Sequence, residues 1–175
     1  MSIATDEAES KYGGTEPLMN RVSQRNAYVA AGGAAFSSDR MDWETPQALF
    51  NSLDAEFHFT LDAASTDDNA KCARHYTPEH SGLDADWSGE TVFCNPPYGR
   101  QLPKWVEKCA HEALKPDTTV VMLIPSRTDT RWFHRWIYRR AQIRFIKGRL
   151  KFETQGTAGD AAPFPSMIAI FGGSQ

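Results

Sequence analysis

Apolar residues fall into segments of two alternating kinds along this chain. Three segments carry apolar residues at helical spacing, and they span residues 43–57, 103–114 and 129–141. Short, nearly continuous apolar runs of the kind that form strands occupy 58–65, 91–94, 119–125, 143–153 and 166–171. This spacing predicts helices in the first set and strands in the second. Because strands and helices alternate before a final series of strands, we expect an α/β fold whose sheet is mostly parallel with an antiparallel edge.

Local signals refine these elements. In 43–57 we expect Thr45 to be the N-cap and Pro46 the first helical residue. The segment 143–153 predicts two strands around Gly148, and the Gly-, Ala- and Pro-rich stretch 155–165 predicts a loop. Residues 66–90 are polar and predict only a short helix, around 68–75.

The first 40 residues differ from the rest of the chain. They are rich in Ser, Ala, Gly and charged residues and show no sustained periodicity. We therefore expect residues 1–40 to be a flexible N-terminal arm and residues 41–175 to form the folded domain.

Composition and charge narrow the class of protein. The chain has 175 residues, 41% of them apolar and 23% charged, which is typical of a soluble globular domain. The net charge of −3 gives no overall attraction to nucleic acid, so any DNA affinity must come from a local basic patch. Three cysteines far apart and scattered histidines predict neither a disulfide framework nor a metal site. With no membrane segment in the sequence, we expect a cytoplasmic protein.

The motif with the clearest chemistry is Asn95-Pro96-Pro97-Tyr98, which follows the apolar run 91–94 directly. Two consecutive prolines end a strand and stiffen the loop after it. The Asn95 side-chain oxygen and the Pro96 carbonyl are two acceptors, which suit the two N–H donors of an exocyclic amino group. Tyr98 can stack on a flat ring. The loop therefore predicts a site that binds the amino group of a base and directs its lone pair at an electrophile, such as a methyl group on a sulfonium.

The ends of the predicted strands indicate where this site lies. In open α/β sheets, ligands bind beyond the carboxyl ends of the strands. Asp62, Asn95 and Ser126 follow or end three of the predicted strands. We expect these three residues to converge on one cleft.

Eight blocks of the sequence, in order, resemble the compact, often phage-encoded DNA N-6-adenine methyltransferases. The blocks are DWETPQALFNSL, FTLDAAS, NAKCARHYT, GLDADW, VFCNPPYGR, WVEKC, VMLIPSRTDTRWFH and IRFIKGRLKF. The resemblance covers residues 42–172. It implies a Rossmann-like, S-adenosyl-L-methionine-dependent methyltransferase fold in a compact, abbreviated form. It also implies methyl transfer to N6 of an adenine flipped out of double-stranded DNA, in the host cytoplasm if the protein is phage-encoded.

The resemblance also implies roles for individual residues. The loop that receives the flipped adenine is formed by Asn95, Pro96, Pro97 and Tyr98. Contacts to the cofactor are implied for Thr45, Pro46, Asp62, Ala63, Asn95, and Asp84 or Asp86. The Gly-rich turn usual after the first strand is absent, because the chain reads DAASTDDNA there. Small Ala and Ser residues must therefore hold the cofactor at that turn.

Arginines predict the surface that contacts DNA. Arg127, Arg131, Arg135 and Arg139 recur every four residues, and the last three lie in the predicted helix 129–141. This pattern is typical either of a solvated helix face or of a stripe that follows phosphates. Arg100, just after the NPPY motif, is a candidate contact to a phosphate beside the target base. We expect Arg100, Arg127, Arg131 and Arg135 to bind DNA.

Two alternative functions remain open on the sequence. The same chemistry could act on another amino group, namely an RNA base, cytosine N4 or a protein glutamine. The chain could instead be a non-catalytic DNA-binding module on the same fold, which the absent Gly-rich turn favours. Assays of methyl acceptance and of cofactor binding separate these readings. The sequence leaves the oligomeric state and the DNA target sequence undetermined.

Overall fold

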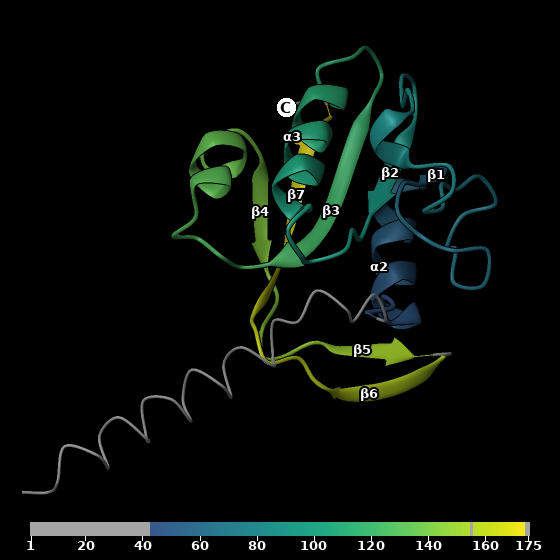
Figure 1. Ribbon diagram of the computed structural model, residues 1–175, viewed down its shortest axis with the longest axis vertical. Coiled ribbons are helices and arrows are strands. Elements are labelled where there is room, and N and C mark those ends of the chain that lie inside the picture. Colours follow the sequence, from purple (N-terminus) through teal and green to yellow (C-terminus); the bar gives the residue numbers. More distant parts are fainter. Residues whose placement is uncertain (1–42, 155, 174–175) are drawn as a thin grey trace, which may run out of the picture. The chain divides into compact units, whose positions relative to one another are not determined.

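The computed structural model describes residues 43–154 and 156–173, and every structural statement below refers to them. The longer helices are α2 (Gln47–Phe57) and α3 (Leu102–Glu112) (Figure 1). Two short helical turns are η1 (Gly82–Asp84) and η2 (Phe133–Ile137). The strands are β1 (Leu61–Asp62), β2 (Thr91–Cys94), β3 (Thr119–Pro125), β4 (Gln142–Phe145), β5 (Lys151–Thr154), β6 (Thr157–Ala161) and β7 (Ser166–Gly172). The arm predicted at 1–40 and its boundary with the folded domain lie outside the described residues.

Five strands form one sheet in the order β1-β2-β3-β7-β4. β1, β2 and β3 pair in parallel, whereas β7 is antiparallel to both β3 and β4. β4 therefore runs in the same direction as β1 to β3, and β7 alone is reversed. The mostly parallel α/β sheet is confirmed, but the antiparallel strand lies inside the sheet rather than at its edge. The reason is that the chain leaves β4, forms the separate β5–β6 hairpin and returns to insert β7 between β3 and β4.

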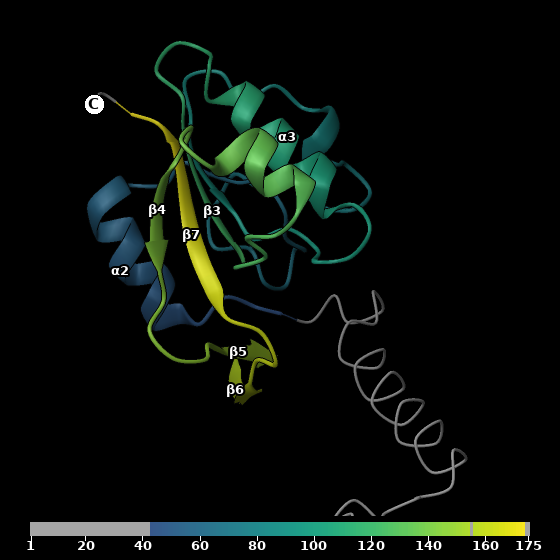
Figure 2. The same cartoon turned by 90° about the vertical axis from the view of Figure 1, so that its left-hand side faces the viewer.

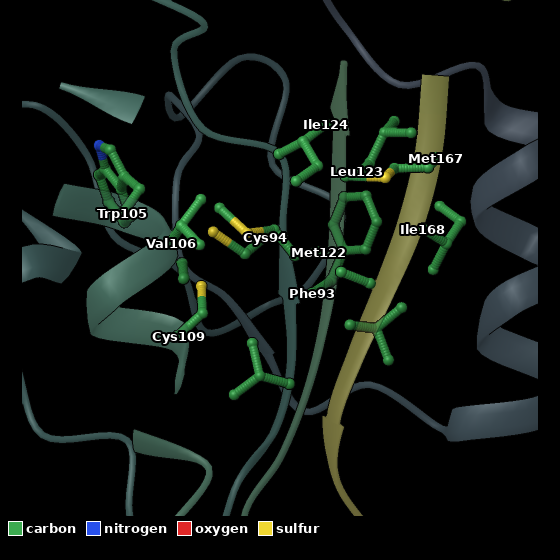
Figure 3. Packing of buried hydrophobic residues seen from close by; sticks show 14 of the residues in the cluster. Phe93, Cys94, Trp105, Val106, Cys109, Met122, Leu123, Ile124, Met167 and Ile168 are labelled. Atoms are coloured by element: carbon green, nitrogen blue, oxygen red, sulfur yellow. The ribbon is translucent and has the colours of Figure 1, made fainter. Parts of the chain in front are cut away.

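Helices α2 and α3 cover opposite faces of this sheet (Figure 2). β3 is buried from Val120 to its end, as its continuous apolar sequence predicted. Side chains alternate between the faces along β2. Phe93 packs edge-on against Phe50 of α2, with ring centroids 5.2 Å apart. Cys94 lies on the opposite face, near Val106 and Cys109 of α3 (Figure 3). The core thus packs on both faces of the strand that leads into the NPPY loop.

Three predicted elements differ from the structure. Helix α2 begins at Gln47, and Pro46 occupies the N-cap position without a side-chain cap, so Thr45 is not the cap. Residues 68–75 form turns instead of a helix, because backbone hydrogen bonds tie this segment to β1; one runs from the Asp62 N–H to the Arg74 carbonyl (3.0 Å). The segment 155–165 is not all loop, since β6 pairs with β5.

The predicted helix 129–141 is shorter than its pattern suggested. Helical structure runs only from residue 131 to Ile137, and η2 has π-helical geometry. The helix ends at Tyr138, whose N–H donates to the Phe133 carbonyl (2.9 Å), and Arg139 adopts a φ of 60°. Phe133 and Ile137 are the buried residues of this turn. The arginine series therefore does not continue along a regular α-helix to Arg139.

A buried ion cluster ties the segment after η1 to helix α3. Glu112 is 4% exposed, and its carboxylate accepts hydrogen bonds from Lys108 Nζ (2.7 Å), Lys115 Nζ (2.6 Å) and the Trp87 N–H (2.8 Å). Burial by itself would raise the pKa of Glu112, but these three bonds outweigh burial and lower it. The cluster stabilises the folded state only while Glu112 is ionised.

We expect this cluster to make the protein less stable in acid. A carboxyl group whose folded pKa lies below the unfolded value of 4.5 contributes stability that is complete above 4.5 and is lost as the pH falls through the folded pKa. The free energy of unfolding in urea should therefore decrease between about pH 6 and about pH 3, and Glu112→Gln should make this decrease smaller. Glu107→Gln, on the same helix but outside the cluster, is the control. Equal pH dependence in both variants would exclude Glu112 as the cause.

Candidate active site

A cavity of about 570 Å³ lies beyond the carboxyl ends of β1 and β2. Its walls come from the loops that follow these two strands, together with Trp43 and Trp105. A cavity of about 50 Å³ adjoins it, shares Trp43 and Asn95 with it, and is lined in addition by Asp62 and Thr45. Asp62 and Asn95 thus come together as expected, whereas Ser126 lines neither cavity. The larger cavity has the size of a typical small-molecule site.

The NPPY loop forms one wall of the main cavity, through Asn95, Pro96 and Pro97. The Asn95 side chain is fixed by hydrogen bonds on both ends of its carboxamide. Nδ2 donates to the Trp43 carbonyl (2.7 Å) and to Thr45 Oγ1 (3.0 Å). Oδ1 accepts a hydrogen bond from the Tyr98 hydroxyl (2.6 Å). Thr45 therefore holds the NPPY loop, in place of the helix-capping role that its sequence position suggested.

Tyr98 lies in the core and not in the cavity. Its ring packs edge-on against Phe164 (centroids 5.6 Å apart) and Phe152 (6.0 Å), and the residue is 9% exposed. Burial raises the pKa of Tyr98 well above its usual value, so the hydroxyl keeps its proton and remains a donor to Asn95. The sequence predicted that this ring would stack on a base. In this structure it is not placed to do so. Its position instead fixes Asn95.

The main cavity is also lined by three aromatic side chains that the sequence did not indicate as site residues: Trp43, Tyr76 and Trp105. Trp43 packs edge-on against Phe152 (5.1 Å) and Phe164 (5.4 Å), the same two rings that contact Tyr98. Each of the three residues belongs to a block that resembles the methyltransferases, and that was the one signal in the sequence. Which face an aromatic residue presents depends on distant segments, so the sequence alone did not indicate the cavity.

Small residues after β1 shape the cavity floor. Ala63, Ala64 and Ser65 line it, in place of the usual Gly-rich turn. Gly82 of η1 packs so closely on this loop that a Cβ atom at position 82 would overlap the carbonyl oxygen of Ala63 and lie 3.4 Å from the Trp105 ring. Gly82 therefore permits the contact between η1 and the cavity floor.

Asp62, the last residue of β1, stabilises the loop that follows this strand. The residue is 2% exposed, and its carboxylate accepts hydrogen bonds from the backbone N–H groups of Lys71 (3.0 Å) and Ala64 (3.3 Å). Burial raises the pKa of Asp62, although these two bonds favour the charged form. Asp62 lines the smaller cavity but not the main one.

Asp84 and Asp86 lie away from both cavities. Both are exposed, and neither is part of a cavity wall. The Asp86 carboxylate accepts hydrogen bonds from Lys115 Nζ (2.7 Å) and Ser88 Oγ (2.6 Å), which lower its pKa. This structure thus gives no support to a cofactor contact through either carboxylate. The GLDADW block contributes Gly82 instead, whose carbonyl accepts a hydrogen bond from the Trp87 indole (3.1 Å).

The four arginines expected to bind DNA occupy different places. Arg100 is exposed and lines the main cavity. Arg127 is half-buried, just beyond the end of β3. Arg131 and Arg135 are exposed on the short helix 131–137, outside the cavity walls, and the Arg135 guanidinium lies over the Trp136 ring (4.8 Å). Of the four, Arg100 alone is placed beside the NPPY loop at the cavity.

Two polar atoms at the main cavity lack a hydrogen-bond partner among the described residues. They are Ser65 Oγ and Trp105 Nε1, both buried. An indole N–H can only donate, so an acceptor on a bound ligand or an ordered water would satisfy Trp105 Nε1. Native proteins rarely leave such buried groups unsatisfied. The cavity therefore has the character of a binding site for a ligand with both polar and ring-shaped parts.

Comparison with known proteins identifies the family. A family model described as DNA N-6-adenine-methyltransferase (Dam) matches residues 33–173. A DNA N-6-adenine-methyltransferase of Haemophilus phage HP1 is 32% identical over 139 residues, which are 77% of this chain and 80% of that protein. One of Escherichia phage T1 is 30% identical over 116 residues, which are 65% of this chain and 48% of that protein. The putative methyltransferase YfdM of Escherichia coli K12 is 41% identical over 63 residues, 32% of this chain and 69% of that protein. The chain therefore belongs to the DNA N-6-adenine-methyltransferase (Dam) family.

Proposed function

We propose that the protein binds S-adenosyl-L-methionine and double-stranded DNA and methylates N6 of an adenine extruded into the main cavity. Its family makes it an adenine-specific DNA methyltransferase, which confirms the reaction class expected from the sequence. The observation that carries the site assignment is the Asn95-Pro96-Pro97 wall of a cavity of about 570 Å³ beyond β1 and β2. The alternatives of another amino acceptor or a non-catalytic module have no comparable support.

The residues of the cavity fit S-adenosyl-L-methionine. Ser65 Oγ and Trp105 Nε1 are unsatisfied polar atoms, and the ribose hydroxyls, ring nitrogens and carboxylate of this cofactor are suitable partners. Ala63 and Ser65 would hold it from the β1 loop, with Ser81 and Trp105 beside them. Thr45 lines only the smaller cavity and Pro46 lines neither, so we assign the cofactor to the main cavity without them. When bound, the cofactor supplies an electrophilic methyl group on a sulfonium.

The NPPY loop orients the acceptor amine. The Asn95 side-chain oxygen and the Pro96 carbonyl would accept the two N–H groups of the target base, which turns its lone pair out of conjugation with the ring. The same two oxygens stabilise the positive charge that develops on nitrogen. Two prolines keep these oxygens in place without reorganisation, because their φ angles are fixed. The loop therefore contributes orientation and electrostatic stabilisation.

Arg100, at the same cavity, would contact a phosphate beside the extruded base, and Arg127, Arg131 and Arg135 would extend this contact along the backbone. Such contacts supply affinity without reading sequence. They would let a protein with a net charge of −3 bind DNA through a local patch.

The proposed function is tested with S-adenosyl-L-methionine that carries a tritiated methyl group. The protein is incubated with an adenine-containing duplex, a duplex that lacks adenine, and RNA of the same sequence, and nucleoside digests are analysed. We expect label in N6-methyladenine from the first duplex alone. No label in adenine, when calorimetry shows that the cofactor binds, would refute the proposal.

Trp105→Phe is expected to weaken cofactor binding about three- to tenfold, because it removes one hydrogen-bond donor and keeps the aromatic ring. The dissociation constant is measured by calorimetry with S-adenosyl-L-methionine. Trp136→Phe, on η2 and outside the cavity walls, is the matched control and should bind like the wild type. Equal affinity in both variants would show that the indole N–H of Trp105 does not contact the cofactor.

A further inference from the structure

The hydrogen bonds of Asn95 determine which way its carboxamide faces. The two ends of a carboxamide have nearly the same shape, but one end donates two hydrogen bonds and the other only accepts. The Nδ2 end lies against two acceptors, the Trp43 carbonyl (2.7 Å) and Thr45 Oγ1 (3.0 Å). A flipped carboxamide would turn Oδ1 toward the Trp43 carbonyl, so that two acceptors would face each other. The segment 43–45 thus excludes the flipped orientation.

The Tyr98 hydroxyl fixes the other end of the same carboxamide. It lies 2.6 Å from Asn95 Oδ1 and 3.3 Å from the Leu123 carbonyl. A hydroxyl has one proton, and the shorter contact with Asn95 is the better hydrogen bond. This bond uses one of the two acceptor positions on Oδ1, so one position remains for a ligand in the cavity that Asn95 lines.

We propose that Thr45 and Tyr98 are positioning residues for methyl transfer: they hold the Asn95 carboxamide with its oxygen available to the target amino group. This inference rests on the proposed function of the NPPY loop. It gives Thr45 a role toward Asn95 in place of the cofactor contact that the resemblance implied. It also gives the Tyr98 hydroxyl a role toward Asn95.

Burial makes this arrangement rigid. Thr45 is 2% exposed, and the Tyr98 ring is enclosed by Phe152 and Phe164. Trp43, whose carbonyl is the third partner, packs on the same two rings. Segments that are far apart in the sequence therefore act on one side chain, and a group held to this degree loses little conformational freedom when it binds its ligand.

The test compares Thr45→Val, which keeps the shape and removes the hydroxyl, with Thr45→Ser, which keeps the hydroxyl. Single-turnover methyl transfer to an adenine-containing duplex is measured at saturating S-adenosyl-L-methionine and DNA, and the cofactor dissociation constant by calorimetry. We expect Thr45→Val to lower the rate about tenfold to a hundredfold and to leave the dissociation constant within about threefold. Thr45→Ser should restore most of the rate.

Thr118→Val controls for the loss of a buried threonine hydroxyl. Thr118 is 4% exposed, and its hydroxyl donates to the Pro116 carbonyl (3.1 Å) just before β3, at the end of the sheet opposite the cavity. Melting temperatures are measured for every variant. Thr118→Val should lose stability without a loss of rate at a temperature where it is folded.

Each other outcome overturns the inference. A higher cofactor dissociation constant with an unchanged saturated rate would make Thr45 a cofactor contact. Equal rate losses in Thr45→Val and Thr118→Val would make its role structural. If Thr45→Val does not fold, Tyr98→Phe is measured in the same way, and an unchanged rate in that variant rejects the positioning role. Absence of methyl transfer by the wild type would instead refute the proposed function itself.

Discussion

Replacing Asn95 by alanine is expected to slow methyl transfer a hundredfold or more. The variant removes one of the two acceptors that would hold the target amine, and loss of one preorganised hydrogen-bonding group of this kind typically lowers the rate by about a hundredfold to a thousandfold. Cofactor binding should change little, because the unsatisfied atoms assigned to the cofactor belong to Ser65 and Trp105. Single-turnover rates at saturating cofactor and duplex, together with calorimetry, measure the two effects separately.

The Asn95→Ala variant also loses the hydrogen bonds to Trp43 and Thr45, so its stability must be measured beside its rate. Asn51→Ala provides the control, since Asn51 is exposed on α2 and its side chain accepts a hydrogen bond only from Gln47 in the described structure. Rates are compared at a temperature where all variants are fully folded. Turnover by Asn95→Ala near the wild-type rate would remove the basis for the assigned role of the NPPY loop.

Replacing Gly82 by alanine is expected to weaken cofactor binding at least tenfold and to lower the free energy of unfolding by about 1–3 kcal/mol. The added Cβ atom would overlap the Ala63 carbonyl oxygen, which is backbone and cannot rotate away. The loop 63–65 would then have to move, and that loop forms the floor of the main cavity. Calorimetry with S-adenosyl-L-methionine and urea denaturation measure the two quantities.

Asp84→Ala is the matched control for this substitution, because Asp84 belongs to the same short helix, is exposed and lies outside the cavity walls. It should bind the cofactor like the wild type. Normal affinity in Gly82→Ala would show that close packing of η1 on the β1 loop does not shape the binding site. A loss of affinity in Asp84→Ala would restore the cofactor contact that the resemblance implied for this carboxylate.

The sequence predicted the elements whose burial follows a regular period. The apolar runs of β2, β3 and β7 and the helical face of α3 were located closely, because each buries a continuous or periodic set of side chains. β6 was missed because every residue in it is exposed, so no apolar pattern marks it. The place of β7 between β3 and β4 was missed as well, since strand order depends on pairing between distant segments and not on any one of them.

In the candidate active site, too, features set by neighbouring residues were predictable and features set by distant segments were not. The NPPY loop was recognisable because two prolines and their neighbours act through local backbone geometry. The direction of the Tyr98 ring could not be predicted, because it depends on Phe152 and Phe164, which lie more than fifty residues away in the sequence. Trp43 and Trp105 likewise become part of the cavity only when the tertiary structure forms. Local chemistry was thus visible in the sequence, whereas its tertiary partners were not.

The insertion of β7 affects the order in which the sheet can assemble during protein synthesis. In the described structure β4 pairs with β7 alone, and β7 comes after β4, β5 and β6 in the sequence. Until the ribosome has released residues 166–172, β4 has no neighbour and β3 has an open edge on the side that β7 will occupy. The nascent domain therefore cannot close its sheet before β7 has been synthesised, when contacts of long sequence separation form together.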